Sequence, residues 1–203
     1  MESARFAQQI AVLTLALAFV ACRPEPGAAD AKAKAPDESL LQSGDLIYRF
    51  GNGLYSAYFR SVSQTDRRFS HVGIAVRTTA GGPLYVVHAE ADDYTGQGGV
   101  RLDRLADFLK EARDRAAYRL NCGEAIRRDI ANRALDYRRR AVPFDLAFDA
   151  ADTTAFYCTE LVSHCVNAAT GCPLIQPRTQ LNGKQFIAID DTYLNDAMTP
   201  VQF

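Results

Sequence analysis

SHVGIAVRTTAGGPLYVVHAE, residues 70–90, is typical of two β-strands joined by a turn. In the first strand, valine and isoleucine alternate with His71 and small residues, so period two places the imidazole opposite the larger apolar side chains. Gly81-Gly82-Pro83 is a turn signal. The second strand places His88 on one face together with Glu90. The small residues beside His71 leave room for another group to approach its ring.

Secondary-structure signals continue outward from this hairpin in both directions. Hydrophobic periodicity and turn residues predict short helices, a β-meander, a long helix and a late helix, which together indicate the α+β class. An irregular acidic loop is expected over 143–157. The predicted strands are 44–48, 70–76, 84–90, 100–102 and 116–120, and the predicted helices are 53–63, 105–112, 123–140 and 159–168.

Composition indicates one ordinary globular domain without a nucleic-acid partner. The chain has 203 residues, is 48% hydrophobic and has a net charge of −1, with 23 basic and 24 acidic side chains. Such a balance offers no basic surface of the kind that nucleic acid requires. Six arginines lie within 123–140, and we interpret them as a solvated helix face balanced by Glu124, Asp129 and Asp136.

The N-terminus differs in composition from the remainder of the chain. Residues 10–21 are apolar except for one threonine, a run that is too short to span a bilayer but suits a signal peptide. The run ends Phe-Val-Ala-Cys22, which resembles a bacterial lipobox. We therefore expect a signal peptide over 1–21, an acylated Cys22, a flexible linker over 22–40 and one domain over 41–203. The expected location is the periplasmic face of the cell envelope, with a secreted soluble protein as the alternative.

Cys158 has the placement of a nucleophile, because it directly precedes the apolar stripe of the late helix. A helix N-terminus and a neighbouring histidine each lower a thiol pKa, and the N–H groups there can hold an oxyanion. His164 is too close in sequence to face Cys158. His71 is the expected base, and His88 is expected to orient it. The pairing of the other three cysteines stays open; they are Cys122, Cys165 and Cys172.

Five motifs carry a family resemblance. In order they are GDLIY, SHVGIAV, VVHAE, PFDLAFD and FYCTELV. They resemble the circularly permuted, YiiX-like branch of the NlpC/p60-type papain-like cysteine hydrolases, over residues 44 to about 168. The resemblance implies an antiparallel sheet packed against a helix that bears the nucleophile Cys158. It implies His71 as the base and His88 as the third residue, a position where many permuted members have Glu. Glu90 is the alternative third residue because it shares the strand face of His88.

The same resemblance gives expectations for residues around the nucleophile. Asp45 lies in the GD motif, where a structural turn role is expected more often than a catalytic one. Asp145 is expected to border the substrate cleft, and Tyr157 to shape the oxyanion pocket. The implied substrate is a cell-wall peptide or a related amide, cleaved through a thioester by a monomer that needs no cofactor and no metal.

Three alternatives remain at this point. The first is a lipid acyl hydrolase or acyltransferase of the same fold, which an anchor at Cys22 suits equally well. The second is an inactive domain that binds cell-wall or lipid ligands. The third is a zinc site formed by His71, His88 and Cys158, which is disfavoured because the chain has no His-x-x-His or Cys-x-x-Cys pair.

Overall fold

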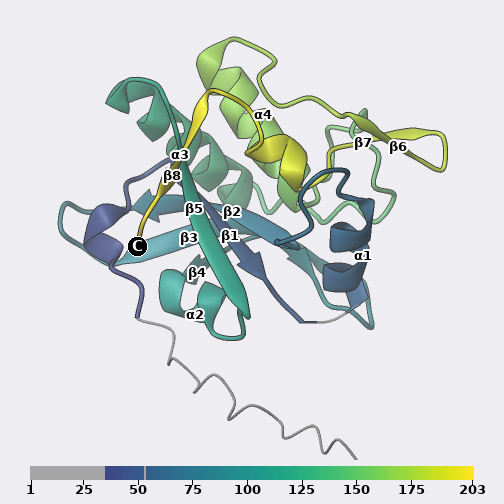
Figure 1. Ribbon diagram of the computed structural model, residues 1–203, viewed down its shortest axis with the longest axis horizontal. Helices are drawn as coiled ribbons and strands as arrows, with labels where there is room; N and C mark the ends of the chain where they lie inside the picture. Colours follow the sequence, from purple (N-terminus) through teal and green to yellow (C-terminus); the bar gives the residue numbers. More distant parts are fainter. Residues whose placement is uncertain (1–34, 53) are drawn as a thin grey trace, which may run out of the picture. The chain divides into compact units, whose positions relative to one another are not determined.

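An antiparallel sheet forms the centre of the computed structural model, which describes residues 35–52 and 54–203 (Figure 1). Six strands run in the spatial order β4-β3-β2-β1-β5-β8, and every neighbouring pair is antiparallel. The compact unit spans Pro36–Phe203. Its elements are η1 (Glu38–Leu40), β1 (Leu46–Phe50), α1 (Leu54–Val62), β2 (His71–Arg77), β3 (Leu84–Ala91), β4 (Gly98–Arg104), α2 (Leu105–Leu109), β5 (Asp114–Leu120), α3 (Glu124–Arg139), α4 (Cys158–Thr170), β6 (Thr179–Leu181), β7 (Lys184–Phe186), η2 (Asp190–Thr192) and β8 (Met198–Val201).

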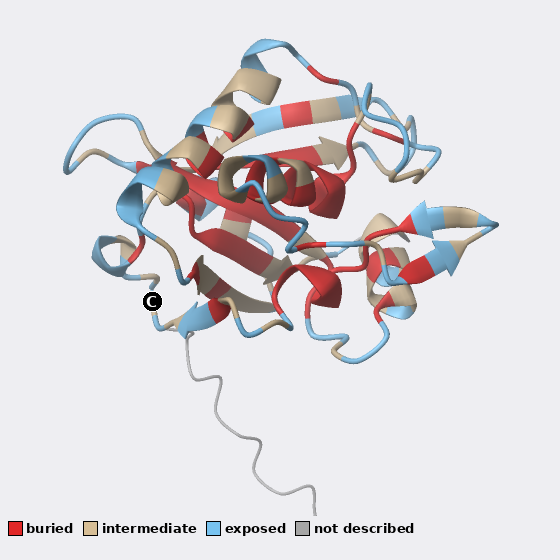
Figure 2. Cartoon of the chain, turned by 90° about the horizontal axis from the view of Figure 1, so that it is seen from above, coloured by how far each residue is buried: buried red, intermediate tan, exposed pale blue. Residues whose placement is uncertain are grey.

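The two faces of the sheet have different covers. Helices α3 and α4 pack on one face and the short helix α2 packs on the other (Figure 1). Val72 and Ile74 of β2 are buried against the α3 and α4 side, whereas Ala75 packs with Phe108 of α2. Figure 2 shows the buried central strands between these covers. The period-two alternation predicted for residues 70–76 is therefore confirmed, and it assigns neighbouring residues to opposite faces.

The entry into β1 shows why the GD motif has its sequence. Gly44 has φ +89, and a Cβ at this position would lie 2.4 Å from the carbonyl oxygen of Arg127. Only glycine adopts this conformation and leaves this space without strain. Asp45 is fully buried; it accepts a hydrogen bond from the N–H of Gln42 at 2.8 Å and pairs with Arg119 at 2.7 Å. Asp45 thus ties the turn to β5.

Helix α4 begins one residue earlier than the periodicity predicts. Tyr157 is the N-cap residue with extended backbone, and Cys158 is the first helical residue. The side-chain oxygen Oε2 of Glu160 accepts a hydrogen bond from the N–H of Tyr157 at 3.3 Å. Gly171, with φ +67, ends the helix in the left-handed conformation that glycine favours. These caps define the two ends of the helix whose first residue is Cys158.

The predicted strands and helices up to residue 168 are all present, whereas no element was predicted beyond that point. The last segment forms the hairpin β6–β7, the turn η2 and the edge strand β8, which pairs with β5. On α3 the arginines form surface ion pairs with Glu124, Asp129 and Asp136, which agrees with a solvated face.

The cysteines of the described chain are all free. Cys165 is buried within α4 and Cys172 is exposed beyond the end of that helix, so the two do not bridge. Cys122 and Cys158 are likewise unpaired.

The expected signal peptide (1–21), Cys22 and most of the expected linker (22–40) lie outside the described residues. Among residues 35–52 and 54–203, no helix is both long enough and apolar enough to cross a membrane.

Candidate active site

Two imidazoles from neighbouring strands meet on the α2 face of the sheet. His71 is the first residue of β2 and His88 lies within β3. The distance from His71 Nε2 to His88 Nδ1 is 2.9 Å. This approach depends on Gly73, since a Cβ there would lie 2.4 Å from Val86 Cγ1 and 3.0 Å from His88 Cβ. Gly73 therefore leaves the space in which His88 approaches His71.

The ring of Phe108 on α2 covers both histidines. Its centroid lies 5.6 Å from the ring of His71 and 4.9 Å from the ring of His88. Loss of hydration lowers the pKa of His71 well below 6.5, and it also lowers the pKa of His88. Both imidazoles are therefore neutral at pH 7.

Asp103 of β4 continues the contact from His88. The distance between His88 Nε2 and Asp103 Oδ2 is 3.0 Å. The hydrogen bond from His88 is the main reason why the pKa of Asp103 falls to about 2. The carboxylate accepts, so Nε2 of the neutral His88 must donate and its Nδ1 must accept. It follows that Nε2 of His71 carries a proton, which leaves the lone pair on His71 Nδ1 available as a base.

The sulfur of Cys158 reaches the same end of β2 from the other side of the sheet. Cys158 is 1% exposed and belongs to the core under α4. Its sulfur lies close enough to the N–H of Val72 and of Thr159 for both to favour the thiolate. Val72 directly follows His71, so the start of α4 adjoins the start of β2. The thiol and the imidazole make no hydrogen bond with each other in this part of the chain; in unliganded enzymes such contacts are often long.

Burial changes the expected protonation of the thiol. The sequence leads us to expect a lowered pKa, because a helix N-terminus and a histidine both favour the thiolate. Instead, burial raises the pKa of Cys158 to about 12, although the nearby N–H groups oppose this. Because His71, the residue before Val72, is neutral as well, the resting groups are a thiol and an imidazole base. If this thiol serves as a nucleophile, its proton has to leave during the attack itself.

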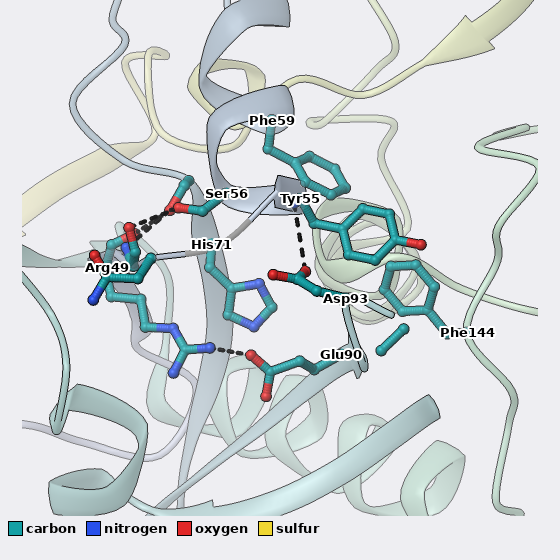
Figure 3. A pocket seen from close by; sticks show the side chains of 12 residues that line it. Arg49, Tyr55, Ser56, Phe59, His71, Glu90, Asp93 and Phe144 are labelled. Atoms are coloured by element: carbon teal, nitrogen blue, oxygen red, sulfur yellow. Dashed lines mark hydrogen bonds and ion pairs between the residues drawn. The ribbon is translucent and has the colours of Figure 1, made fainter. Parts of the chain in front are cut away.

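A pocket opens beside His71 (Figure 3). One wall is polar, with Arg49 donating to Glu90 in an ion pair and Ser56 bonded to Ser70 at 2.6 Å. The opposite wall is aromatic. The aromatic residues that line the pocket are Tyr55, Phe59 and Phe144. Because Phe59 belongs to the core under α4, the pocket lies where the two faces of the sheet meet.

The remaining predicted site residues lie in other surroundings. Asp45 is in the turn before β1 and does not line the pocket. Tyr157 is buried; its ring stacks on Phe186 and its hydroxyl accepts the N–H of Ile187 at 2.9 Å. Asp145 is buried, and its carboxylate accepts the N–H groups of Ala147 and Asp149. These contacts show that Asp45 stabilises the turn before β1, that Tyr157 packs in the core and that Asp145 stabilises the loop before α4.

Glu90 and His88, the two candidates for the third residue, differ in their bonding partners. Glu90 is held by Arg49, with its Oε2 3.9 Å from His88 Nδ1, whereas His88 bonds His71 directly. The sequence did not single out Asp103 or Arg49. The available signal for Asp103 was the β3–β4 hairpin, in which period two and a turn near Gly96 put Asp103 on the face of His88.

One group of side chains in the described chain has the spacing of metal ligands, and it comprises His71, His88 and Glu90. Cys158 is not part of it, so the zinc ligand set considered from the sequence differs from the one that the structure brings together.

Comparisons with known proteins bear on the family and the fold of the chain. The model of the permuted papain-like amidases, YaeF/YiiX, C92 family, matches residues 40–190. A crystal structure of the metalloprotein yiiX from Escherichia coli O157:H7 aligns with a TM-score of 0.64 at 17% identity, covering 79% of this chain and 96% of that one. At this identity the likeness shows the fold. No curated protein sequence matches the chain.

Proposed function

Since the chain belongs to the family of permuted papain-like amidases and is an enzyme of the cysteine hydrolase type, we propose that it cleaves an amide through a thioester on Cys158. In this proposal His71 is the base and His88 holds it in place. The observation that carries the proposal is the hydrogen-bonded series from His71 through His88 to Asp103, which leaves Nδ1 of His71 as a free acceptor.

The proposed reaction starts from the neutral pair. Nδ1 of His71 takes the thiol proton while the sulfur attacks the carbonyl carbon. Backbone N–H groups at the start of α4 stabilise the oxyanion, and each such donor contributes about 3 kcal/mol. The imidazolium then protonates the leaving amine and the thioester forms. Water attacks the thioester, gives its proton to His71 and releases the carboxylic acid and the thiol.

The lining of the pocket supports a peptide-like amide as the substrate. Hydrogen-bonding side chains form one wall, beginning with Arg49 and Glu90, and they suit polar groups next to the scissile bond. A long acyl chain would require an extended apolar groove, whereas the apolar part here is limited to three rings. A cell-wall peptide or a related amide therefore fits better than an acyl lipid.

The test compares the wild type with Cys158→Ala on peptidoglycan stem peptides and on acyl lipids, with products identified by mass spectrometry. We expect amide cleavage by the wild type only, and an acid-quenched thioester on the peptide that contains Cys158. The control is Cys172→Ala, because Cys172 is an exposed thiol beyond the end of α4, whereas Cys158 is buried at its start. Equal product from wild type and Cys158→Ala would reject the proposal. If only acyl lipids were turned over, the substrate would be an acyl lipid and not a peptide amide. Ligand binding without any product would indicate an inactive binding domain.

We also propose that the chain acts as a monomer at the periplasmic face of the envelope, held by an acyl group on Cys22. The support is the apolar run that ends in Phe-Val-Ala-Cys22. The mass of the mature protein from its native host tests this. A chain that begins at Cys22 with added acyl mass is expected, and retention of residues 1–21 would rule the anchor out.

A further inference from the structure

Three atoms with metal-binding capacity converge beside the pocket, one each from His71, His88 and Glu90. These atoms lie within 4.8 Å of one another. His71 Nε2 is 2.9 Å from His88 Nδ1, which is 3.9 Å from Oε2 of Glu90. In a tetrahedral zinc site with metal–ligand distances of about 2.0–2.1 Å, two ligands lie about 3.3 Å apart. The three atoms therefore need only small movements to share one cation.

Asp103 supplies the outer contact that metal-binding histidines commonly have. Its carboxylate accepts a hydrogen bond from His88 Nε2, which directs His88 Nδ1 toward the other two ligand atoms. A carboxylate in this position fixes the ring and raises the affinity of the imidazole for a metal. The same contact that orients His88 for catalysis thus also prepares it as a ligand.

Arg49 and Arg101 both pair with Glu90, and each of them has a second partner that remains if the contact with Glu90 breaks. Arg49 donates to Glu90 but also donates to the carbonyl oxygen of Phe108 at 2.7 Å. Arg101 lies 3.4 Å from Glu90 Oε2 but also pairs with Asp103 at 2.9 Å. Each guanidinium keeps a partner when Glu90 turns to a cation. The arginines compete with the metal for Glu90, so removal of one of them should strengthen metal binding.

We propose that His71, His88 and Glu90 form a site for a divalent transition-metal ion such as Zn²⁺, and that an ion bound there inhibits the enzyme. His88 coordinates through Nδ1 and keeps its proton on Nε2. His71 coordinates through Nε2, so its single proton moves to Nδ1 and none is gained or lost. Nδ1–H cannot accept the proton of Cys158, and inhibition follows. This second half rests on the proposed role of His71, whereas the binding half does not.

The binding test uses zinc alone, titrated into metal-free Cys158→Ala protein and followed by calorimetry. We expect one ion per chain. Glu90→Gln should weaken binding at least about tenfold and His88→Ala should abolish it, while Arg101→Gln should strengthen it. His164→Ala is the matched control, because His164 lies on α4 against Phe156, away from these ligands. Circular dichroism checks that each variant is folded.

Several results would overturn the binding half: no zinc bound by the Cys158→Ala protein, equal affinity in Glu90→Gln, or loss of binding in His164→Ala. A cobalt complex of the wild type adds a second readout, since a thiolate charge-transfer band would place Cys158 in the ligand set and contradict the proposal. Inhibition is measured separately, as amidase activity of the wild type with and without zinc. Zinc bound at full occupancy with undiminished amidase activity would overturn inhibition alone, whereas a chain that binds zinc but never cleaves an amide would overturn the proposed function and leave the metal site intact.

Discussion

The two faces of the central sheet have different kinds of side chain, although the same strands form both. On the α4 face, Val72 and Ile74 of β2 pack into the main core together with Cys158. On the α2 face, alternate residues of β2 and β3 place His71 and His88 in a hydrogen-bonded series that ends at a carboxylate. One face therefore holds the candidate nucleophile in an apolar environment, and the other holds ionisable groups.

This difference explains why the site lies at the end of β2. A thiol on one face and an imidazole on the other cannot meet through the sheet, and they can meet only where the sheet ends. His71 is the first residue of its strand, and the sulfur of Cys158 adjoins the N–H of the next residue, Val72. In the proposed mechanism each face supplies one reacting group, and the neutral resting state follows because burial disfavours the charged form of both groups.

The largest expected effect comes from removing the reacting group of the α2 face. His71→Ala should lower kcat/KM for amide cleavage by about 10³-fold, because a positioned base contributes roughly 10² to 10⁴. His164→Ala, which alters a histidine of α4 that packs against Phe156, should change kcat/KM less than about threefold. Similar losses in the two variants would show that the contrast between the faces is wrong.

A second prediction separates the carboxylates of the α2 face. Asp103→Asn should lower kcat by about 10²-fold with little change in KM, because an amide no longer enforces the tautomer that leaves His71 Nδ1 unprotonated. Glu90→Gln should lower kcat less, about tenfold or below, since Glu90 bonds Arg49 rather than a histidine. Steady-state kinetics of both variants decides between them. A greater loss of kcat in Glu90→Gln would make Glu90 the orienting residue.

The alternation of residues 70–76 and 84–90 was enough to predict the hairpin, to turn His71 away from the larger apolar side chains of its strand and to put His88 on the face of Glu90. Period two is a local property, so it is visible in the sequence. Asp103 was missed because its contact with His88 depends on the register of β3 against β4, which the turn between them sets. The helix start at Cys158 was predicted within one residue from the apolar stripe and the preceding loop.

Burial is the quantity that the sequence did not reveal. The helix N-terminus at Cys158 predicts a lowered thiol pKa, but the core around the sulfur raises it instead. The ring of Tyr157 stacks on Phe186 of the β6–β7 hairpin, a contact that the sequence did not indicate. Both differences come from packing between segments that are far apart in sequence, where local patterns carry no information.

A third prediction concerns Gly73, whose missing side chain allows β2 and β3 to bring His71 and His88 together on the α2 face. Gly73→Ala should lower the free energy of unfolding by about 1–3 kcal/mol, because the new Cβ would lie 2.4 Å from Val86 Cγ1 and 2.9 Å from the carbonyl oxygen of Val87. Gly51→Ala is the control, since a Cβ there meets its neighbours at 3.8 Å or more. Urea denaturation measures both. Equal stabilities would mean that the β2–β3 contact adjusts freely.

The smallest effect belongs to the α4 face, where Glu160 is fully buried and its Oε1 has no hydrogen-bond partner. Burial raises the pKa of Glu160 to about 9, with Asp145 adding to the rise. The folded chain therefore keeps a proton that the unfolded chain loses near pH 4.5, so stability from this group declines as pH rises toward 9. Glu160→Gln stays neutral and should become more stable relative to wild type by at least about 1 kcal/mol between pH 6 and pH 8. The control is Glu124→Gln, because Glu124 is exposed and its replacement should show no such change in urea denaturation. If the difference in unfolding free energy between Glu160→Gln and the wild type did not vary with pH, the Glu160 carboxyl would be ionised. The α4 face would then tolerate charge as the α2 face does.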